Sequence, residues 1–254
     1  MKNINSYINE KLVIGKNIIH KTKIQVSTKE ELKSILEERI NEDKNANFND
    51  LDVSEITNMN GLFINLDPHD IKIDKWDVSQ VKDMGGMFYR CANFNSDLSK
   101  WDVSKVESMD DMFCNCKKFN SDLSNWNVSN VINMNSMFSY CENFKGNGLE
   151  KWNVSKVEDM GYMFHMCKKM NCDLSNWDVN KVKDMMWMFS NCEEFDSDLS
   201  NWKVFKVKYM NSMFKGCKKF NSDLNNWNVS KVKAMAYMFL RCDSLKNKPS
   251  WYVK

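Results

Sequence analysis

The sequence predicts a repeat solenoid, because tryptophan recurs at a nearly constant interval and the residues between successive tryptophans follow one pattern. The intervals are 25, 25, 26, 25, 25, 25 and 24 residues. One unit reads L-x-x-W-x-V-x-x-V-x-x-M-x-x-M-F-x-x-C-x-x-F, which has the spacing of the leucine-rich-repeat template at a length within its range of about 20–29 residues. The expected fold class is therefore a leucine-rich-repeat-like solenoid. The tryptophans of the series are Trp76, Trp101, Trp126, Trp152, Trp177, Trp202, Trp227 and Trp251.

The spacing within one repeat predicts a strand followed by a helical turn. Trp101 and Val103 are two residues apart, so both point to one side of an extended segment. The next apolar residues have the i, i+3, i+4, i+7 spacing of one face of a short helix. A single coil cannot bury its own apolar face, so neighbouring coils must stack. We expect a parallel sheet on one side and short helices or helical turns on the other. The helical positions are Met109, Met112, Phe113 and Cys116.

The solenoid is expected to span residues 51–254. It contains one degenerate repeat at 51–75, seven repeats at 76–250 and the start of another at 251. A one-residue insertion falls at 145–148, where two glycines allow a bulged turn. Because the last coil is incomplete, we expect that an uncapped C-terminal coil could associate end to end with another chain.

Residues 1–50 do not repeat, and they are expected to form an N-terminal segment with a capping helix near 28–42. Ser27 and Glu30 have the spacing of a capping box. This helix is expected to cover the first coil, since a terminal coil otherwise exposes apolar residues and open strand edges. A short strand is expected around residues 12–14. The apolar residues spaced for one face of the helix are Leu32, Ile35, Leu36 and Ile40.

The composition argues against several classes of function. The 254 residues include 19 Met, 9 Trp and 9 Cys but only 8 Gly, 2 Pro and 3 His, which disfavours Gly-rich phosphate loops and metal sites built from histidine. No acid–base pair or activated nucleophile departs from the periodic background, so we expect no enzyme, no catalytic residue and no cofactor. No apolar run is long enough for a secretory signal or a membrane span. We therefore expect no membrane insertion, and the odd number of cysteines favours free thiols in a reducing compartment.

The repeated sulfur residues could be interpreted as metal sites, but core packing explains them better. Cysteine is a small, well-buried filler, and Leu66 takes its place in the degenerate repeat. The two methionines of each repeat share a face with phenylalanine, so we expect them in the core rather than on a soft metal. We expect no metal site. The cysteine series is Cys91, Cys116, Cys141, Cys167, Cys192, Cys217 and Cys242.

Two further ladders are polar. An aspartate that directly precedes the leucine of most repeats is similar to the ladders of calcium-binding β-rolls, but those need Gly-rich turns, so we expect it to bond turn amides. A serine ladder has no neighbouring base and is expected to satisfy backbone groups at a corner of the coil. Asn180 and Phe205 interrupt the serines. The aspartates are Asp97, Asp122, Asp173, Asp198 and Asp223, and the serines are Ser79, Ser104, Ser129, Ser155 and Ser230.

Variable positions beside the expected strand carry the first candidate binding surface. Residues 51–176 hold 13 basic and 18 acidic residues, whereas 177–254 hold 14 basic and 8 acidic residues. Lysines that recur at the repeat interval should stack into a basic stripe, which is interpreted either as a solvated face or as a site for an acidic protein or an anionic glycan. Nucleic acid is not expected, because no exposed aromatic except Phe205 interleaves with the lysines. The candidate residues are Lys181, Lys183, Lys203, Phe205, Lys206, Lys208, Lys231 and Lys233.

A second candidate surface lies on the outer side of the expected helical turns. Tyr162, Trp187 and Tyr237 occupy its outward positions, with Tyr89 and Tyr140 nearby. Aromatic residues are enriched in interface cores. Packing between adjacent coils is the alternative explanation.

The repeats resemble those of the BspA-like leucine-rich-repeat surface proteins, whose unit reads W-[DN]-V-S-x-V-x-x-M-x-x-M-F-x-x-C-x-x-F-N-x-D-L-S. Segments such as Trp101-Asp102-Val103-Ser104 carry the resemblance, which covers residues 51 to 254. It implies a non-enzymatic protein of the cell surface that binds a protein or a glycan partner through its strand face, in adhesion or host interaction. This chain lacks the lipoprotein signal of that family, so a cytoplasmic location is the alternative. The alternative function is a structural spacer or stalk without a ligand.

Overall fold

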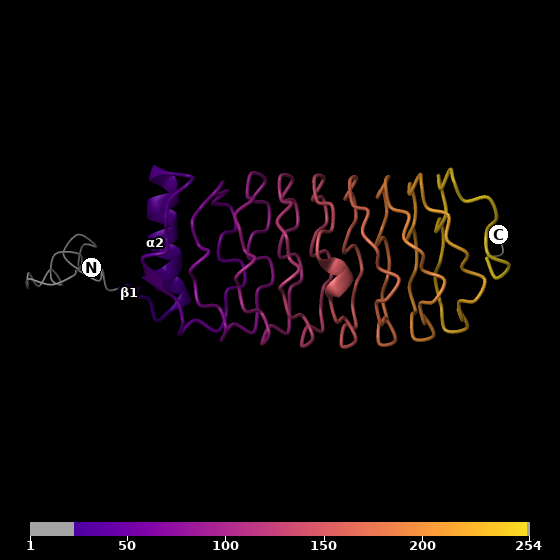
Figure 1. The fold of residues 1–254 in the computed structure, drawn as a ribbon, viewed down its shortest axis with the longest axis horizontal. Helices are drawn as coiled ribbons and strands as arrows, with labels where there is room; N and C mark the ends of the chain where they lie inside the picture. The colour runs from indigo at the N-terminus through magenta and orange to yellow at the C-terminus, as the bar shows by residue number, and fades with distance from the viewer. Residues whose placement is uncertain (1–22, 253–254) are drawn as a thin grey trace, which may run out of the picture.

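The computed structural model describes residues 23–252, which form an elongated stack of similar coils (Figure 1). Helix α2 lies at one end of the stack and the C-terminus lies at the other. The strand expected around residues 12–14 falls outside the described residues. We name each coil after its first tryptophan, and the degenerate repeat is the Leu51 coil.

Regular secondary structure is sparse in this part of the chain. Strand β1 spans Ile24–Gln25, helix α2 spans Lys29–Glu42, strand β2 spans Leu51–Asp52, and a 3-10 helix, η1, spans Leu149–Lys151. Strands β1 and β2 pair in parallel. Through its pairing with β2, strand β1 therefore links the segment that precedes α2 to the first coil.

Helix α2 begins one residue later than a Ser27 capping box would place it. Thr28 is the N-cap, and its hydroxyl accepts a hydrogen bond from the amide of Glu31 at 3.2 Å. The Glu31 carboxylate in turn accepts from the amide of Ser27 at 3.2 Å. Thr28 and Glu31 thus take the roles expected of Ser27 and Glu30. The apolar face lies where the sequence places it, because Leu32, Ile35, Leu36 and Ile40 are all buried.

The coils are held together by backbone hydrogen bonds across the segment that contains both methionines. In the Trp101 coil, the amides of Met109, Asp111, Phe113 and Asn115 donate to carbonyls of the next coil at 2.7–3.0 Å. Alternate amides bond within the coil instead, as Met112 does to the carbonyl of Met109 at 3.2 Å. Neighbouring peptide groups thus serve two purposes, turn formation and axial pairing. We call this set of inter-coil bonds the axial ladder.

The helical turn expected in this segment is replaced by a run of tight turns. Asp111 and Asn115 have φ angles of 54° and 65°, and a right-handed helix requires φ near −60°. The corresponding residues of most other coils also have positive φ. Successive turns bury residues at i, i+3, i+4 and i+7 just as a helix does, which explains why the spacing indicated a helix. Left-handed backbone at two positions turns every second amide toward the next coil.

The expected parallel strand also lies elsewhere. Isolated parallel bridges join the residue before the first methionine in successive coils, such as Ser108 to Asn133. Trp101 instead ends a turn, because its amide donates to the Leu98 carbonyl at 3.1 Å. The tryptophans pair the coils through their side chains: the indole Nε1 of Trp126 donates at 3.0 Å to the carbonyl of Leu98, which lies one repeat before Leu123, the acceptor of the Trp126 amide. The bond meets the need of a buried indole N–H for an acceptor.

The core consists of columns of identical residues that run along the stack. Phe88 and Phe113 stack with their ring centroids 5.6 Å apart, and Trp177 and Trp202 stack at 6.5 Å. The prediction that the paired methionines form the core is confirmed, since Met109 and Met112 are fully buried, as are nearly all their counterparts. We propose the solenoid class for this stack on the ground of these columns and the axial ladder. Its leucine-rich-repeat type stays a prediction, because regular strands in the described residues occur only at β1 and β2.

The sulfur and aspartate ladders occupy structural positions. The thiol of Cys116 is buried and donates to the Phe88 carbonyl of the preceding coil at 3.0 Å. Burial raises the pKa of Cys91 to about 12, so this thiol stays protonated at neutral pH. Asp97 accepts from the amide of Ser99 at 2.9 Å, and that backbone hydrogen bond lowers the pKa of Asp97. The prediction that the aspartates bond turn amides is confirmed, since the other members of the series repeat this bond.

The insertion at 145–148 is absorbed without disturbing the core. Gly146 and Gly148 have φ angles of 87° and 91°, which are strained for any residue with a Cβ. Helix η1 follows at once, so Leu149 is fully buried at the leucine position and Trp152 is buried at the tryptophan position. The insertion therefore forms the expected turn, in which Lys145 and Asn147 are exposed and both glycines are buried.

Two glycine-to-alanine changes should separate backbone strain from steric overlap. Gly61 has φ 61° and open space where a Cβ would lie, whereas a Cβ on Gly148 would overlap the backbone of Ser124. We expect Gly61→Ala to lower the free energy of unfolding by about 1 kcal/mol, the usual penalty of left-handed backbone. Gly148→Ala should lower it by at least twice as much. Denaturation midpoints followed by tryptophan fluorescence measure both, and equal losses would contradict the close approach of the two coils.

Candidate functional site

The six repeat-spaced lysines form two exposed columns on three consecutive coils. We call them the lysine stripe: Lys181, Lys183, Lys206, Lys208, Lys231 and Lys233. The amide of Lys208 donates to the carbonyl of Lys183 at 2.8 Å, and that of Lys233 donates to Lys208 at 2.8 Å. Backbone bonds therefore set the register of one column. The second column faces the same way, because the intervening Val207 is buried between two exposed lysines.

The charges of the stripe are mostly uncompensated. Lys183 pairs with Glu158 of the preceding coil at 2.5 Å. Within residues 23–252, no ion pair joins any of the other five stripe lysines or Lys203 to a carboxylate. Lysines on another side of the coil behave differently: Lys168 and Lys218 each reach back to a glutamate of the preceding coil, at 2.7 and 2.5 Å. The stripe is thus a local excess of positive charge.

Glu158 marks the N-terminal boundary of the stripe. Its hydrogen bond from Lys183 lowers the pKa of Glu158, and the charges of Lys181 and Lys206 act in the same direction. In the coil before it, Ile132 occupies the same column and is 45% exposed. The column that contains Lys183 therefore turns basic abruptly at the Trp177 coil.

The middle coil of the stripe departs from the other repeats at three positions. In most coils the residue after the tryptophan is Asp or Asn, whose side chain accepts from the amide two residues later, as Asp102 does from Ser104 at 3.0 Å. Lys203 has no acceptor atom, so it cannot make this bond to Phe205. Phe205 is 38% exposed, in a column that holds serine in most coils.

Tyr209 is a site residue that the sequence reasoning missed. It is 38% exposed and lies just after Lys208, so in the sequence Phe205 and Tyr209 flank the two lysines of the middle coil. The available signal was a departure from the repeat, because neighbouring coils have Asp184 and Ala234 at this position.

The second candidate surface is assembled only in part. Tyr162 and Trp187 lie parallel with ring centroids 6.0 Å apart. The His165 ring meets them edge-on at 6.0 and 5.5 Å, and it also meets Tyr140 at 5.0 Å. The Lys215 ammonium lies 4.9 Å from the Trp187 ring centroid. We call Tyr140, Tyr162, His165 and Trp187 the aromatic cluster.

Tyr237 stands at the same repeat position as Tyr162 and Trp187 but is not in contact with this cluster. It lies two coils beyond Trp187, with Ser212 at the same position in between, and it is 67% exposed. Tyr162 and Trp187 have φ angles of 57° and 58°, which cost about 1–3 kcal/mol for a bulky side chain. Stacking of the two rings across adjacent coils offsets part of this cost, so packing between coils explains much of why Tyr162 and Trp187 lie together.

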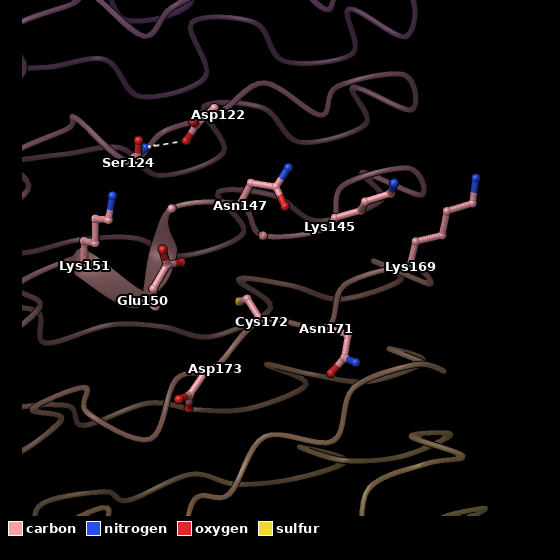
Figure 2. Close-up of a pocket in the computed structure, with 12 residues that line it drawn as sticks. Asp122, Ser124, Lys145, Asn147, Glu150, Lys151, Lys169, Asn171, Cys172 and Asp173 are labelled. Carbon is pink, nitrogen blue, oxygen red and sulfur yellow. Dashed lines mark hydrogen bonds between the residues drawn. The ribbon is translucent and has the colours of Figure 1, made fainter.

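The insertion creates an open hollow of about 690 Å³ on another part of the stack. Figure 2 shows Lys145 and Lys169 toward one side of it and Glu150 and Lys151 toward the other, with Cys172 between them. Burial raises the pKa of Cys172 to about 12, which leaves a protonated, weakly nucleophilic thiol. The acidic Asp122 and Asp173 at the rim accept turn amides at 2.9 Å. The hollow therefore has no single charge preference.

The structure supplies two further observations. Within the described range, no three His, Cys, Asp or Glu side chains gather in a way that could hold a metal ion. None of the helices in residues 23–252 combines the length and apolar character that crossing a bilayer requires.

The fold and the site together define a class of protein, namely a stack of repeated coils that carries a variable, charged surface. The family model described as "Mycoplasma protein of unknown function, DUF285" matches residues 30–148 and 140–252. The chain belongs to this family, which is the BspA-like repeat family in Mycoplasma and Spiroplasma. The two matches meet at the insertion. No curated protein matches the chain.

His165 should make the stability of the stack depend on pH. Its side chain is 8% exposed and its Nδ1 has no hydrogen-bond partner among the described residues. Burial lowers the pKa of His165 below its usual 6.5, and the charge of Lys215 adds to this. The unfolded chain then binds the proton more readily. The free energy of unfolding is therefore highest above about pH 6.5, where His165 is neutral in both states, and it falls as the pH drops below that value.

Thermal unfolding at about pH 7.5 and about pH 5.5, on either side of the usual histidine pKa, tests this expectation. His165→Phe keeps an aromatic ring without a titrating group, so it should lose less stability between the two pH values than the parent protein does. His69→Gln, at a half-buried site away from the cluster, is the matched control and should follow the parent. Identical pH dependence in all three proteins would contradict the role of His165.

Proposed function

We propose that this protein is a non-enzymatic binding protein that captures an acidic partner on the lysine stripe. The observation that carries the proposal is the contrast between two sets of lysines in one repeat. Some lysines outside the stripe, such as Lys168 and Lys218, are neutralised by glutamates of the preceding coil. Others, such as Lys82, are exposed without an ion pair among the described residues, but the equivalent position of the next coil holds Glu107 rather than a second lysine. Five of the six stripe lysines have no such partner among the described residues.

Electrostatics supports this proposal. Successive coils are about 4.8 Å apart if they follow the spacing of paired strands, and two like charges at such a distance repel by roughly 1 kcal/mol in water. An isolated protein gains nothing from six stacked ammonium groups. A bound polyanion would convert the mutual repulsion into attraction and would speed association.

The spacer alternative accounts less well for the surface. A stalk would need only the columns of the core, and all coils would then look alike from outside. The surface instead changes from acidic at residues 51–176 to basic at 177–254, and the middle coil of the stripe breaks the repeat at Lys203, Phe205 and Tyr209. The family resemblance favours display on a cell surface, where protein and glycan partners are both available.

Charge reversal on one column tests the proposal. The triple variant K181E/K206E/K231E changes three exposed lysines that lack carboxylate partners among the described residues. The matched control K117E/K118E/K145E makes the same change of net charge on exposed lysines at other repeat positions, outside the columns of the stripe. We expect the stripe variant to lose at least tenfold in affinity for immobilised heparin or poly-glutamate, while the control retains most of it.

Binding to the parent protein should also weaken steeply between about 50 and 200 mM salt, because released counterions oppose polyanion binding. Equal retention of the two triple variants at both salt concentrations would refute the stripe as a binding site.

A further inference from the structure

The residues around the lysine stripe indicate which class of acidic partner binds there. Resting on the function proposed above, we infer that the stripe binds a linear anionic glycan laid along the axis of the stack, with a sugar ring packed against Phe205 or Tyr209. The lysines would meet sulfate or carboxylate groups on successive sugars. Three features of the stripe lead to this choice.

The first feature is that the positive charge comes from lysine alone. All six stripe residues and Lys203 are lysines, and the described part of the stripe contains no arginine. Cores of protein interfaces are enriched in arginine and depleted of lysine. A row of flexible point charges suits a polymer whose anionic groups are spread along its length, since it requires no fixed bidentate geometry.

The second feature is the position of the exposed aromatic rings. Phe205 and Tyr209 are each 38% exposed, and both belong to the middle coil, one on either side of Lys206 and Lys208. The apolar C–H face of a pyranose packs on an aromatic ring, while its acidic substituents point outward to the neighbouring lysines. Both kinds of contact are available here within one coil and its two neighbours.

The same rings argue against a nucleic acid. A single strand stacks successive bases on successive aromatic residues, which would require rings in consecutive coils. The counterparts of Phe205 are Asn180 and Ser230, and those of Tyr209 are Asp184 and Ala234. Only the middle of the three stripe coils supplies rings at these described positions.

The third feature is the end, at Glu158, of the column that contains Lys183, whereas the column of Lys181 continues to Lys156 in the same coil. This carboxylate neutralises Lys183 at 2.5 Å and lies in the same column as Lys183 and Lys208. The bound polymer would therefore extend from the Trp177 coil toward the C-terminal end of the stack. Lys156 lies two residues before Glu158 in the same coil, and its ammonium donates to Asn130 of the preceding coil at 2.6 Å. Replacing Glu158 by lysine would lengthen the stripe by one coil.

Two sets of variants test the inference against three probes: heparin, poly-glutamate and single-stranded oligo-dT. The double variant F205S/Y209S introduces serine, which other coils already have at these positions (Ser230 and Ser108). We expect its affinity for heparin to fall roughly tenfold, the usual effect of losing an aromatic stacking contact. Its affinity for poly-glutamate should change by less than about twofold, because no ring contact is lost there. The parent protein should bind heparin more tightly than oligo-dT of equal charge.

The second set gains function, so a folding defect cannot produce the expected result. Glu158→Lys should raise the affinity for heparin roughly threefold, as one added ionic contact would do. Glu55→Lys makes the same charge change on an exposed residue of the Leu51 coil and should have little effect. Equal gains in the two variants would show that net charge alone acts, and would overturn the placement along the axis.

The outcomes separate the glycan from the underlying function. If K181E/K206E/K231E loses binding to every probe but F205S/Y209S binds heparin as the parent does, the stripe is a general polyanion site and the glycan inference is wrong. Tighter binding of oligo-dT or poly-glutamate than of heparin would also overturn it. If the lysine variant loses nothing, the proposed function itself fails.

Discussion

The axial ladder is the interaction on which the rest of the structure depends. In every described coil except the last, alternate amides of the methionine segment point along the stack and donate to the next coil, as those of Met109, Asp111 and Phe113 do. This orientation is possible because one residue in each turn adopts left-handed backbone. Register between coils is then set by the main chain, and every side chain is placed above its counterpart in the neighbouring coil.

This register produces columns of equivalent residues, both in the core and on the surface of the stack. The tryptophan, phenylalanine, methionine and cysteine columns bury apolar surface that no single coil could bury, which is the usual source of stability in repeat arrays. Polar atoms that enter the core find partners in the adjacent coil, as the indole of Trp126 and the thiol of Cys116 do. On the surface, the same register stacks like charges upon one another. Along the stack, a column can be neutralised by glutamates or left charged, and the two columns of the lysine stripe are left charged at five of their six lysines.

Side chains at the left-handed positions show how far the repeat tolerates variation. Asn and Asp adopt this conformation at little cost, and glycine at almost none, yet Tyr162 and Trp187 also occupy it. Their rings stack on each other and surround the buried His165. The backbone conformation is imposed by the axial ladder, so the side chain adapts to it. An aromatic cluster can therefore form by packing alone, without a ligand.

Parts of the structure that rest on local pattern could be predicted well. The apolar stripe of α2 and the positions of the core methionines follow from periodic burial, and the glycines of the insertion follow from their conformational freedom. Two elements could not be predicted because different backbones share one pattern. Residues at i, i+3, i+4 and i+7 are buried by a run of tight turns as well as by a helix, and the spacing of Trp101 and Val103 fits a turn-bounded corner as well as a strand. Tyr209 was missed because its exposure depends on the face of the ladder on which its column lies.

The amino-acid sequence by itself determined the repeat, its length, the identity of the core columns and the drift of charge from acidic to basic. These properties follow from the order of residues along the chain, because each coil carries the same residues at the same positions. Only the tertiary structure decided which lysines are neutralised, which aromatic rings reach the surface and where the basic stripe ends. Each of these depends on contacts between residues one repeat apart, such as that of Lys183 with Glu158, and such contacts exist only once the axial ladder has set the coils in register.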